Sequence, residues 1–170
     1  MPFTIRQLQP SEWAVLKAVR LKALQTDPSV FGSNYQKESL MNEVDWQNWL
    51  TGPDCAVFCI FEGEQPVGIT GVAVDRNDPT RKKSILWGSW LEPHVRGQGV
   101  SVMMYEARIN WAKNHLVVEK IVVGHRASNL ASKFANQKHG FVFTTQNEKT
   151  WPDNTVEDEL HYELMVKPAS

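Results

Sequence analysis

Two glycines one residue apart, Gly97 and Gly99, stand behind Arg96 and ahead of a stretch with helical periodicity. A chain that enters a helix leaves its first amide groups without partners, and these amides point at whatever lies ahead of the helix. The helix dipole adds partial positive charge at the same place, and glycine has no Cβ atom to hold a bulky anion away. The amides of residues 97–101 are therefore suited to hold a phosphate or a pyrophosphate.

Two familiar phosphate-binding loops do not fit this segment. A dinucleotide-binding G-x-G-x-x-G loop requires a third glycine at the position where this chain has Val102. A P-loop requires Lys directly after its last glycine, but Gly99 is followed by Val100. For the segment taken alone, a plain strand-to-helix turn without a ligand also stays open.

A longer stretch, L-E-P-H-V-R-G-Q-G-V-S at residues 91–101, supports a third interpretation. It resembles the acetyl-CoA signature of the GNAT superfamily of N-acetyltransferases. That signature is Arg or Gln, two residues, Gly, one residue, then Gly or Ala, after a strand that ends in an aliphatic residue, any residue and Pro. Ser101 stands where the signature has Gly or Ala, which is a small departure because Ser is also small.

Two further segments carry the same resemblance. A second block at residues 129–141 begins with Asn and reaches Gly-Phe after ten residues, as the family's second block does, and Lys138 falls where Lys is frequent. The N-terminal R-L-K-A-L and D-P-S-V-F-G-S, at residues 20–24 and 27–33, are similar to the opening of many GNAT proteins. On these segments, in this order, the chain is identified as a member of the superfamily over essentially its whole length.

The resemblance implies an α/β fold of the α+β kind, the GNAT fold, as one domain over residues 1–170. Its mixed, mostly antiparallel sheet has helices on both faces. The fourth and fifth strands, here residues 84–91 and 119–125, splay apart and hold acetyl-CoA, the co-substrate, between them. The pyrophosphate would lie on the glycine loop, and the pantetheine arm would pair with the backbone of the fourth strand like an added strand. The coenzyme-binding residues implied are Trp90, Leu91, Arg96, Gly97, Gln98, Gly99, Val100, Ser101 and Asn129.

The resemblance also implies direct N-acetylation, in which a neutral primary amine attacks the thioester carbonyl. The amine would belong to a small molecule or to a protein or peptide. Glu38, in the loop region that usually faces the acceptor, and His125, at the end of the fifth strand, are candidate bases, and a chain of waters is an equal candidate. Asn136 is the third catalytic candidate, because it occupies the position of the family's usual acid, a Tyr seven residues after the Asn.

Asn136 keeps other functions open, because an amide cannot act as a phenol. One alternative is a protein of the same fold that binds acyl-CoA without efficient turnover, as a sensor or a partner-binding module. Another is a transferase for a longer acyl-CoA. Trp151, in a polar loop before Pro152, would either cover the acceptor cleft or anchor its loop.

The elements that must position these residues follow from the spacing of apolar side chains. Between them, Gly-Pro, Asp-Pro and polar stretches mark the turns. Periodicity predicts helices at about residues 11–25, 39–50, 100–111 and 130–138, and strands at about residues 3–8, 55–61, 67–74, 84–91, 119–123, 141–145 and 160–166.

The bulk composition excludes several classes of protein. Eighteen Lys and Arg against nineteen Asp and Glu leave a formal charge of -1 over 170 residues, so there is no basic field for nucleic acid. No stretch approaches the ~20 apolar residues that span a membrane. Cys55 and Cys59 offer too few ligands for a metal site, and reduced thiols together with the absence of a signal peptide fit a cytoplasmic protein. The oligomeric state stays open, a homodimer included.

Overall fold

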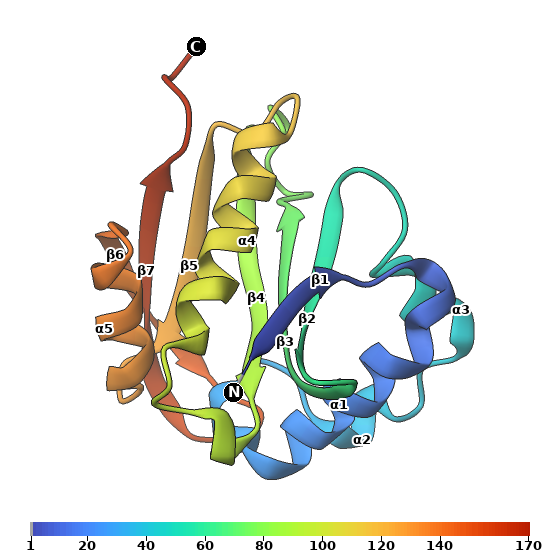
Figure 1. Ribbon diagram of the computed structural model, residues 1–170. Helices are drawn as coiled ribbons and strands as arrows, with labels where there is room; N and C mark the ends of the chain where they lie inside the picture. Colours follow the sequence, from blue (N-terminus) through green and yellow to red (C-terminus); the bar gives the residue numbers. More distant parts are fainter. Residues whose placement is uncertain (1) are drawn as a thin grey trace.

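Seven strands form one sheet in the computed structural model, which describes residues 2–170 (Figure 1). All seven predicted strands are present, in the predicted order along the chain. The strands are β1 (Phe3–Gln7), β2 (Cys55–Glu62), β3 (Gln65–Val74), β4 (Lys83–Leu91), β5 (Lys120–Arg126), β6 (Val142–Thr150) and β7 (Val156–Met165). The α-helices are α1 (Trp13–Thr26), α2 (Tyr35–Glu38), α3 (Glu43–Asn48), α4 (Val100–Asn114) and α5 (Leu130–Lys138).

The sheet is mixed, and its one parallel contact shapes the molecule. The strand order is β1-β2-β3-β4-β5-β7-β6, and every neighbouring pair is antiparallel except β4 and β5. Those two strands pair only at their first residues, from Lys83↔Lys120 to Ile85↔Val122. β5 then continues alongside β7, and β4 alongside β3, so the two strands splay apart. This confirms the predicted fold class, including the separated fourth and fifth strands.

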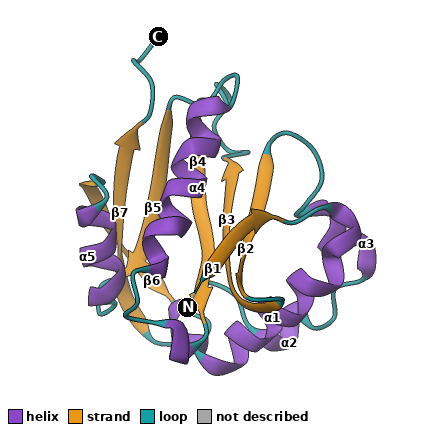
Figure 2. Cartoon of the chain, in the orientation of Figure 1, coloured by secondary structure: helices purple, strands orange, loops and turns teal. Residues whose placement is uncertain are grey.

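Helices cover both faces of the sheet, because successive residues of its central strands point to opposite sides. On β2, Val57, Cys59 and Phe61 pack with α1 and α3 in one buried cluster. Ala56 and Ile60 face the other way, toward clusters that contain residues of α4. Figure 2 shows α4 lying over β4 and β5, and α5 beside β5 and β7. The edge of α4 therefore borders the gap between the splayed strands.

The longest helices are α1, with 14 residues, and α4, with 15. None of the helices in residues 2–170 combines the length and the apolar character needed to cross a membrane.

The helix expected at residues 39–50 is wrong in its boundaries, because only α3 lies within that range and a separate helix, α2, ends just before it. The side chain of Asn34 accepts from the amide of Lys37 and begins α2, which ends before Ser39. Asn42 and Asp45 then accept from each other's backbone amides, at 2.9 Å each, and this capping box begins α3. The two Asn caps mark where these helices begin.

The last two strands are longer than predicted. β6 runs to Thr150 rather than to about residue 145, and β7 begins at Val156 rather than at about residue 160. Nearly every side chain of β6 is exposed, since it is the edge of the sheet. An edge strand of this kind has no buried face, so it lacks the alternation of apolar residues that reveals a strand in a sequence.

Candidate active site

A cavity of about 640 Å³ opens where β4 and β5 separate. Its walls come from β4, the glycine loop, the first half of α4, the end of β5 and α5. Glu38 and Gln98 are not among its lining residues. The expected site residues that do line it are Trp90, Leu91, Arg96, Gly97, Gly99, Val100, Ser101, His125, Asn129 and Asn136.

The glycine loop has the backbone that its sequence predicts. Gly97 and Gly99 have φ angles of +76° and +77°, a conformation that glycine adopts without steric cost. A Cβ atom built on either residue would meet no atom of residues 2–170 within 4 Å, so the space before the loop is open. Gly99 is the N-cap of α4 and brings no capping side chain. The first amides of this helix are therefore available to an anion.

Arg96 fixes the loop to the end of β4. Its Nε donates to the carbonyl of Leu91 at 3.0 Å, and its Nη2 donates to Asp27 at 2.6 Å. The indole of Trp90 donates to the same carboxylate at 2.8 Å from the far side of the strand. Because the Trp90 side chain is buried in the core, only its backbone can serve a ligand in the cleft. Gln98 bonds the carbonyl of His94 at 2.8 Å and so stabilises the loop from outside.

Asn129 lies across the cleft from β4 and is the N-cap of α5. Its Oδ1 accepts from the amide of Ser132 at 3.1 Å, which leaves the amide nitrogen of the side chain for a ligand. A capping role and a coenzyme-binding role are compatible, because they use different atoms of the side chain.

His125 lies inside the cleft with both ring nitrogens engaged. Nδ1 is 2.7 Å from the carbonyl of Arg126, which can only accept, so Nδ1 carries the proton of the neutral ring. Nε2 is then an acceptor, and the hydroxyl of Tyr162 donates to it at 3.1 Å. His125 lines the cavity, whereas Tyr162 is 1% exposed and lies behind it, outside the lining.

Glu38 stands outside the cavity and is buried, with 3% of its surface exposed. Its two carboxylate oxygens accept from Nε and Nη2 of Arg20 at 2.8 and 3.0 Å. The bidentate ion pair occupies both carboxylate oxygens, so neither is left for a substrate amine. This geometry favours a structural role for Glu38.

Asn136 is 1% exposed and meets a phenol that the sequence analysis did not select. The hydroxyl of Tyr105, on α4, donates to Asn136 Oδ1 at 2.5 Å. Burial raises the pKa of Tyr105 and keeps the phenol protonated. The side-chain amide nitrogen of Asn136 is also buried, and no acceptor in the described part of the chain reaches it.

Arg108, one turn further along α4, is the second residue that the sequence analysis missed. It is 2% exposed and lines the cavity. Its Nη1 donates to Ser89 Oγ at 2.8 Å, and Ser89 in turn bonds Thr70 at 2.7 Å. Ser89 reaches the cavity because β4 carries an extra residue opposite Ile69 to Gly71 of β3, which re-aims its side chain.

A helical wheel of α4 could have exposed both residues. Met103, Ala107 and Trp111 are apolar and recur at helical spacing, but all three are only half-buried. The face that is buried instead contains a phenol and a guanidinium. Its members are Val100, Met104, Tyr105, Arg108 and Ala112.

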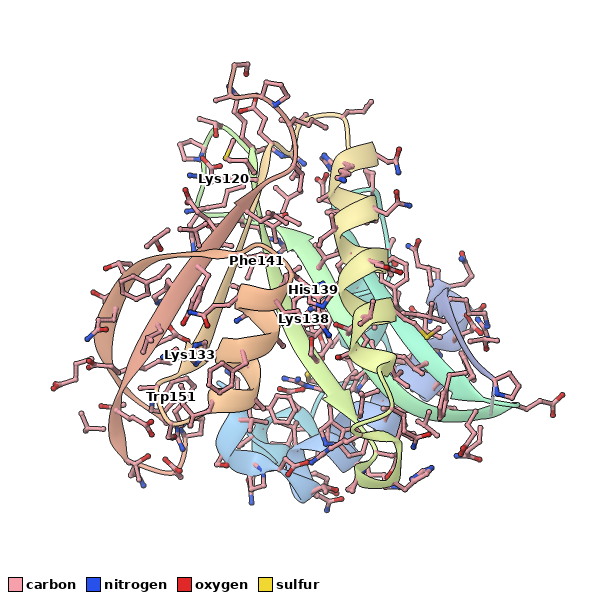
Figure 3. All side chains as sticks on the ribbon, turned by 60° about the vertical axis from the view of Figure 1, so that its left-hand side comes forward. Lys120, Lys133, Lys138, His139, Phe141 and Trp151 are labelled. Atoms are coloured by element: carbon pink, nitrogen blue, oxygen red, sulfur yellow. The ribbon has the colours of Figure 1, made fainter. Side chains whose placement is uncertain are left out.

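His139 and Trp151 have packing roles. The His139 ring, at the end of α5, stacks on Tyr105 with centroids 4.1 Å apart, on the side of α5 that faces α4 (Figure 3). Burial lowers the pKa of His139 and favours its neutral form. Trp151 is 3% exposed, and its indole donates to the carbonyl of Glu157 at 3.0 Å, so it anchors its loop and does not cover the cleft.

A second cavity, of about 650 Å³, lies near the C-terminal end of α4. It contains none of the expected site residues. Asp54 lies in the wall of this cavity and contacts both Arg81 and His115, so the carboxylate already has partners within the chain. Among residues 2–170, no three His, Cys, Asp or Glu side chains are grouped closely enough to hold a metal ion. Of these two cavities, the one between β4 and β5 is the one that contains expected site residues.

Comparison with known proteins identifies the family of the chain. The family model described as "Acetyltransferase (GNAT) domain" matches residues 3–142. No curated protein matches the sequence. Among solved structures, a GNAT-family acetyltransferase from Streptococcus pneumoniae superposes with a TM-score of 0.81 at 20% identity, over 96% of this chain and 99% of the other.

Two other solved structures extend the comparison. The yncA protein of Salmonella typhimurium, solved with its cofactor acetyl-CoA, has a TM-score of 0.83 at 15% identity over 100% of this chain and 97% of its own. The ribosomal-protein-S18-alanine N-acetyltransferase of Escherichia coli has a TM-score of 0.72 at 16% identity, over 99% and 97% of the two chains. The fold, the glycine loop and the family match lead to one conclusion: the chain belongs to the GNAT acetyltransferase family, whose co-substrate is acetyl-CoA.

Proposed function

We propose that the chain is an N-acetyltransferase that moves the acetyl group of acetyl-CoA to a primary amine by direct attack. One observation carries the proposal. A single cavity runs from the open amides of the glycine loop to His125 and Asn136, along the edge of β4 that has lost its pairing with β5. That edge offers backbone groups to an extended pantetheine arm, and the amides of α4 offer a seat for the pyrophosphate.

In the proposed reaction, the amine nitrogen attacks the thioester carbonyl carbon, an N–C bond forms and the C–S bond breaks. The ammonium must lose a proton before the attack, and the departing thiolate gains one. We assign the first step to His125, which lines the cavity and would receive the proton through water once Tyr162 releases Nε2. Glu38 is the weaker candidate, because Arg20 holds both of its oxygens.

For the second proton we propose the pair of Asn136 and Tyr105. Asn136 stands where relatives usually have a Tyr, and its Oδ1 brings the phenol of Tyr105 to the same position from α4. A phenol that stays protonated at neutral pH can donate to a thiolate as it leaves. The pair thus supplies from two helices what the family usually supplies from one.

Asn136 also supports a second candidate function, a sensor or partner-binding module that holds acyl-CoA without turnover. The Tyr105 proton points at Asn136 in this structure, so it must reorient before it can serve the sulfur. A protein that only binds acyl-CoA would not need this step. A transferase for a longer acyl-CoA is a third candidate, since the cavity of about 640 Å³ also extends to Leu86 and Val123.

The partner of the reaction is a small-molecule amine or a protein or peptide amine. We keep a homodimer within the proposal, because β6 is an exposed edge strand with Val142 and Phe143 on its surface. The cytoplasmic location expected from the sequence stays a prediction; both cysteines are free thiols.

The test begins with the glycine loop. Replacing Gly99 by Val puts a branched side chain into the space proposed for the pyrophosphate and strains a residue with φ +77°. We expect the Kd of CoA, measured by calorimetry, to rise at least tenfold, about 1.4 kcal/mol. Gly63→Val is the matched control, because Gly63 has φ +61° and open surroundings but lies in the turn between β2 and β3.

Thiol release from acetyl-CoA with a broad panel of amines then separates enzyme from sensor. Turnover with any amine supports the transferase. Tight CoA binding that depends on Gly99, with no turnover across the panel, supports the sensor. If Gly99→Val folds and binds CoA as tightly as the unmodified chain does, the loop does not hold the pyrophosphate and both functions lose their basis.

A further inference from the structure

Arg108 carries a buried positive charge that no acidic side chain neutralises. Its guanidinium donates to the carbonyl of Met104 at 3.0 Å and to Ser89 Oγ at 2.8 Å, both neutral groups. Within residues 2–170, no carboxylate lies within 4 Å of it. Its other close neighbour is the ring of Tyr105, 5.0 Å from the guanidinium carbon.

Such an arrangement is costly, because a buried ion loses its hydration and regains that energy only from a partner of opposite charge. Burial lowers the pKa of Arg108 to about 10, which still leaves it charged at neutral pH. The other cleft arginine, Arg96, shows the usual solution, since Asp27 pairs with it at 2.6 Å. An unpaired buried charge in a cleft is a feature of functional sites more than of stable cores.

A second donor without a partner lies beside the first. The side-chain amide nitrogen of Asn136 is buried, and no acceptor in the described residues reaches it. Tyr105 connects the two, since its hydroxyl bonds Asn136 Oδ1 and its ring lies against Arg108. All three side chains line the same cavity. We call the part of the cavity lined by Arg108, Tyr105 and Asn136 the reacting end. It presents a positive charge and an amide donor, and neither has an anionic partner among the residues described above.

The proposed substrates in their simplest form do not fit this end of the cleft. An acetyl thioester is neutral and brings one carbonyl oxygen. A simple amine arrives as an ammonium ion, which Arg108 would repel in a low-dielectric site. A substrate that brings its own anion resolves both problems, and a carboxylate matches the planar fork of a guanidinium.

We propose that the reacting end of the cleft is a carboxylate-binding subsite, in which Arg108 and the side-chain amide of Asn136 hold a carboxylate carried by one of the two substrates. The inference rests on the proposed transferase function and specifies its substrate class. Two sources share this chemistry. The carboxylate belongs either to the acyl group, as in succinyl-CoA, or to an acceptor that is an α-amino acid.

Calorimetric binding separates the two sources without relying on turnover. In the acyl arm, the Kd of succinyl-CoA is compared with that of butyryl-CoA, which has a methyl group in place of the carboxylate. In the acceptor arm, amino acids and their amides are titrated into the protein saturated with CoA. We expect the carboxylate member to bind at least tenfold more tightly in one arm.

Three variants locate the preference. Arg108→Gln should abolish it, and Arg108→Lys should retain part of it, because Lys keeps the charge without the fork. Lys113→Gln is the matched control, since it removes one positive charge from the exposed side of the same helix and should leave the preference intact.

Each other outcome counts against the subsite. No preference in either arm of the unmodified protein overturns it, whatever the variants do. A preference that survives in Arg108→Gln shows that another group holds the carboxylate. If Arg108→Gln weakens the binding of the carboxylate ligand and of its uncharged counterpart equally, and lowers turnover with every acyl donor, then Arg108 stabilises the thiolate instead. If acetyl-CoA itself does not bind, the proposed function fails, and that result is distinct from a missing preference.

Discussion

Two buried arginines on opposite sides of the sheet have opposite surroundings. Arg20, on α1, is 6% exposed and forms a bidentate ion pair with Glu38, in a cluster that also holds Phe31 and Trp49. Arg108, on α4, is 2% exposed and has only neutral partners. A buried charge that is neutralised within the chain is tolerated by the fold only as long as its partner stays, whereas a charge without a partner is available to a ligand. The difference separates the part of the molecule that is built for stability from the part that is built for binding.

The largest effect is expected at the paired arginine. Replacing Glu38 by Gln removes the negative charge and leaves Arg20 buried without compensation, which should lower the free energy of unfolding by about 3–5 kcal/mol. Urea unfolding followed by tryptophan fluorescence measures the loss. The double variant Arg20→Met with Glu38→Leu removes both charges and should recover much of the stability.

A different result would revive Glu38 as a base. In that case Glu38→Gln would unfold at the same urea concentration as the unmodified protein and would lose only kcat. The comparison between the two arginines would then need another explanation for the ion pair.

The second largest effect is expected on turnover, when the hydroxyl of Tyr105, beside Arg108, is removed. Tyr105→Phe keeps the ring that stacks on His139 but removes the proton proposed for the thiolate, so kcat should fall about 100-fold, the lower end for general acid catalysis. Steady-state kinetics at saturating acetyl-CoA give the value. Tyr35→Phe, on α2 outside the cavity, controls for the loss of a phenolic hydroxyl.

Asn136 refines this prediction. If Asn136 only positions the phenol, Asn136→Ala should lower kcat several-fold with little change in KM. If it binds a substrate directly, KM should rise sharply. Unchanged kcat in Tyr105→Phe would show that water protonates the thiolate.

The unpaired arginine should respond to removal in the opposite sense to the paired one. Arg108→Met keeps a long apolar side chain on α4 and removes the uncompensated charge, so the free energy of unfolding should rise by about 1–2 kcal/mol. The same variant should lose the preference for carboxylates. Thermal unfolding without ligand tests the first statement. A loss of stability like that of Glu38→Gln would mean that Arg108 is a structural residue and would remove the contrast.

The smallest effect is expected on the pH dependence of stability, through His139, whose ring stacks on Tyr105. Burial lowers the pKa of His139, so the folded protein binds this proton less readily than the unfolded chain, whose ordinary value is 6.5. The stabilisation is complete above pH 6.5 and is lost as the pH falls through the lowered value. His139→Phe keeps the stack and should flatten the dependence of Tm on pH below 6.5.

The comparison also explains what the sequence could predict. The glycine loop is a local motif, because its conformation depends on residues that are adjacent in the sequence. The positive φ angles of Gly97 and Gly99 could therefore be expected from the residue types alone. The splayed strands were predicted through the resemblance to the family. The last two strands were predicted too short, because β6 has no buried face and so lacks an alternating apolar pattern in the sequence.

The reacting end was harder to predict, because its contacts join distant segments. Tyr105 meets Asn136 across 31 residues, and Arg108 meets Ser89 across 19. Glu38 was selected for its place in a loop, but its partner, Arg20, lies 18 residues away on another helix. Residue types and spacing suggest such groups, while only packing decides which charge is neutralised.

The three parallel residue pairs between β4 and β5 have a mechanical consequence. Within residues 2–170 they form the only strand pairing between a four-stranded half, β1 to β4, and a three-stranded half, β5 to β7. Such a short seam resists opening less than the long ladders on either side, so slow amide exchange should distinguish the two halves. A pantetheine arm placed along the free edge of β4 would extend the seam and make the two halves exchange as one body. On this view, the coenzyme is a structural part of the sheet as well as the source of the acetyl group.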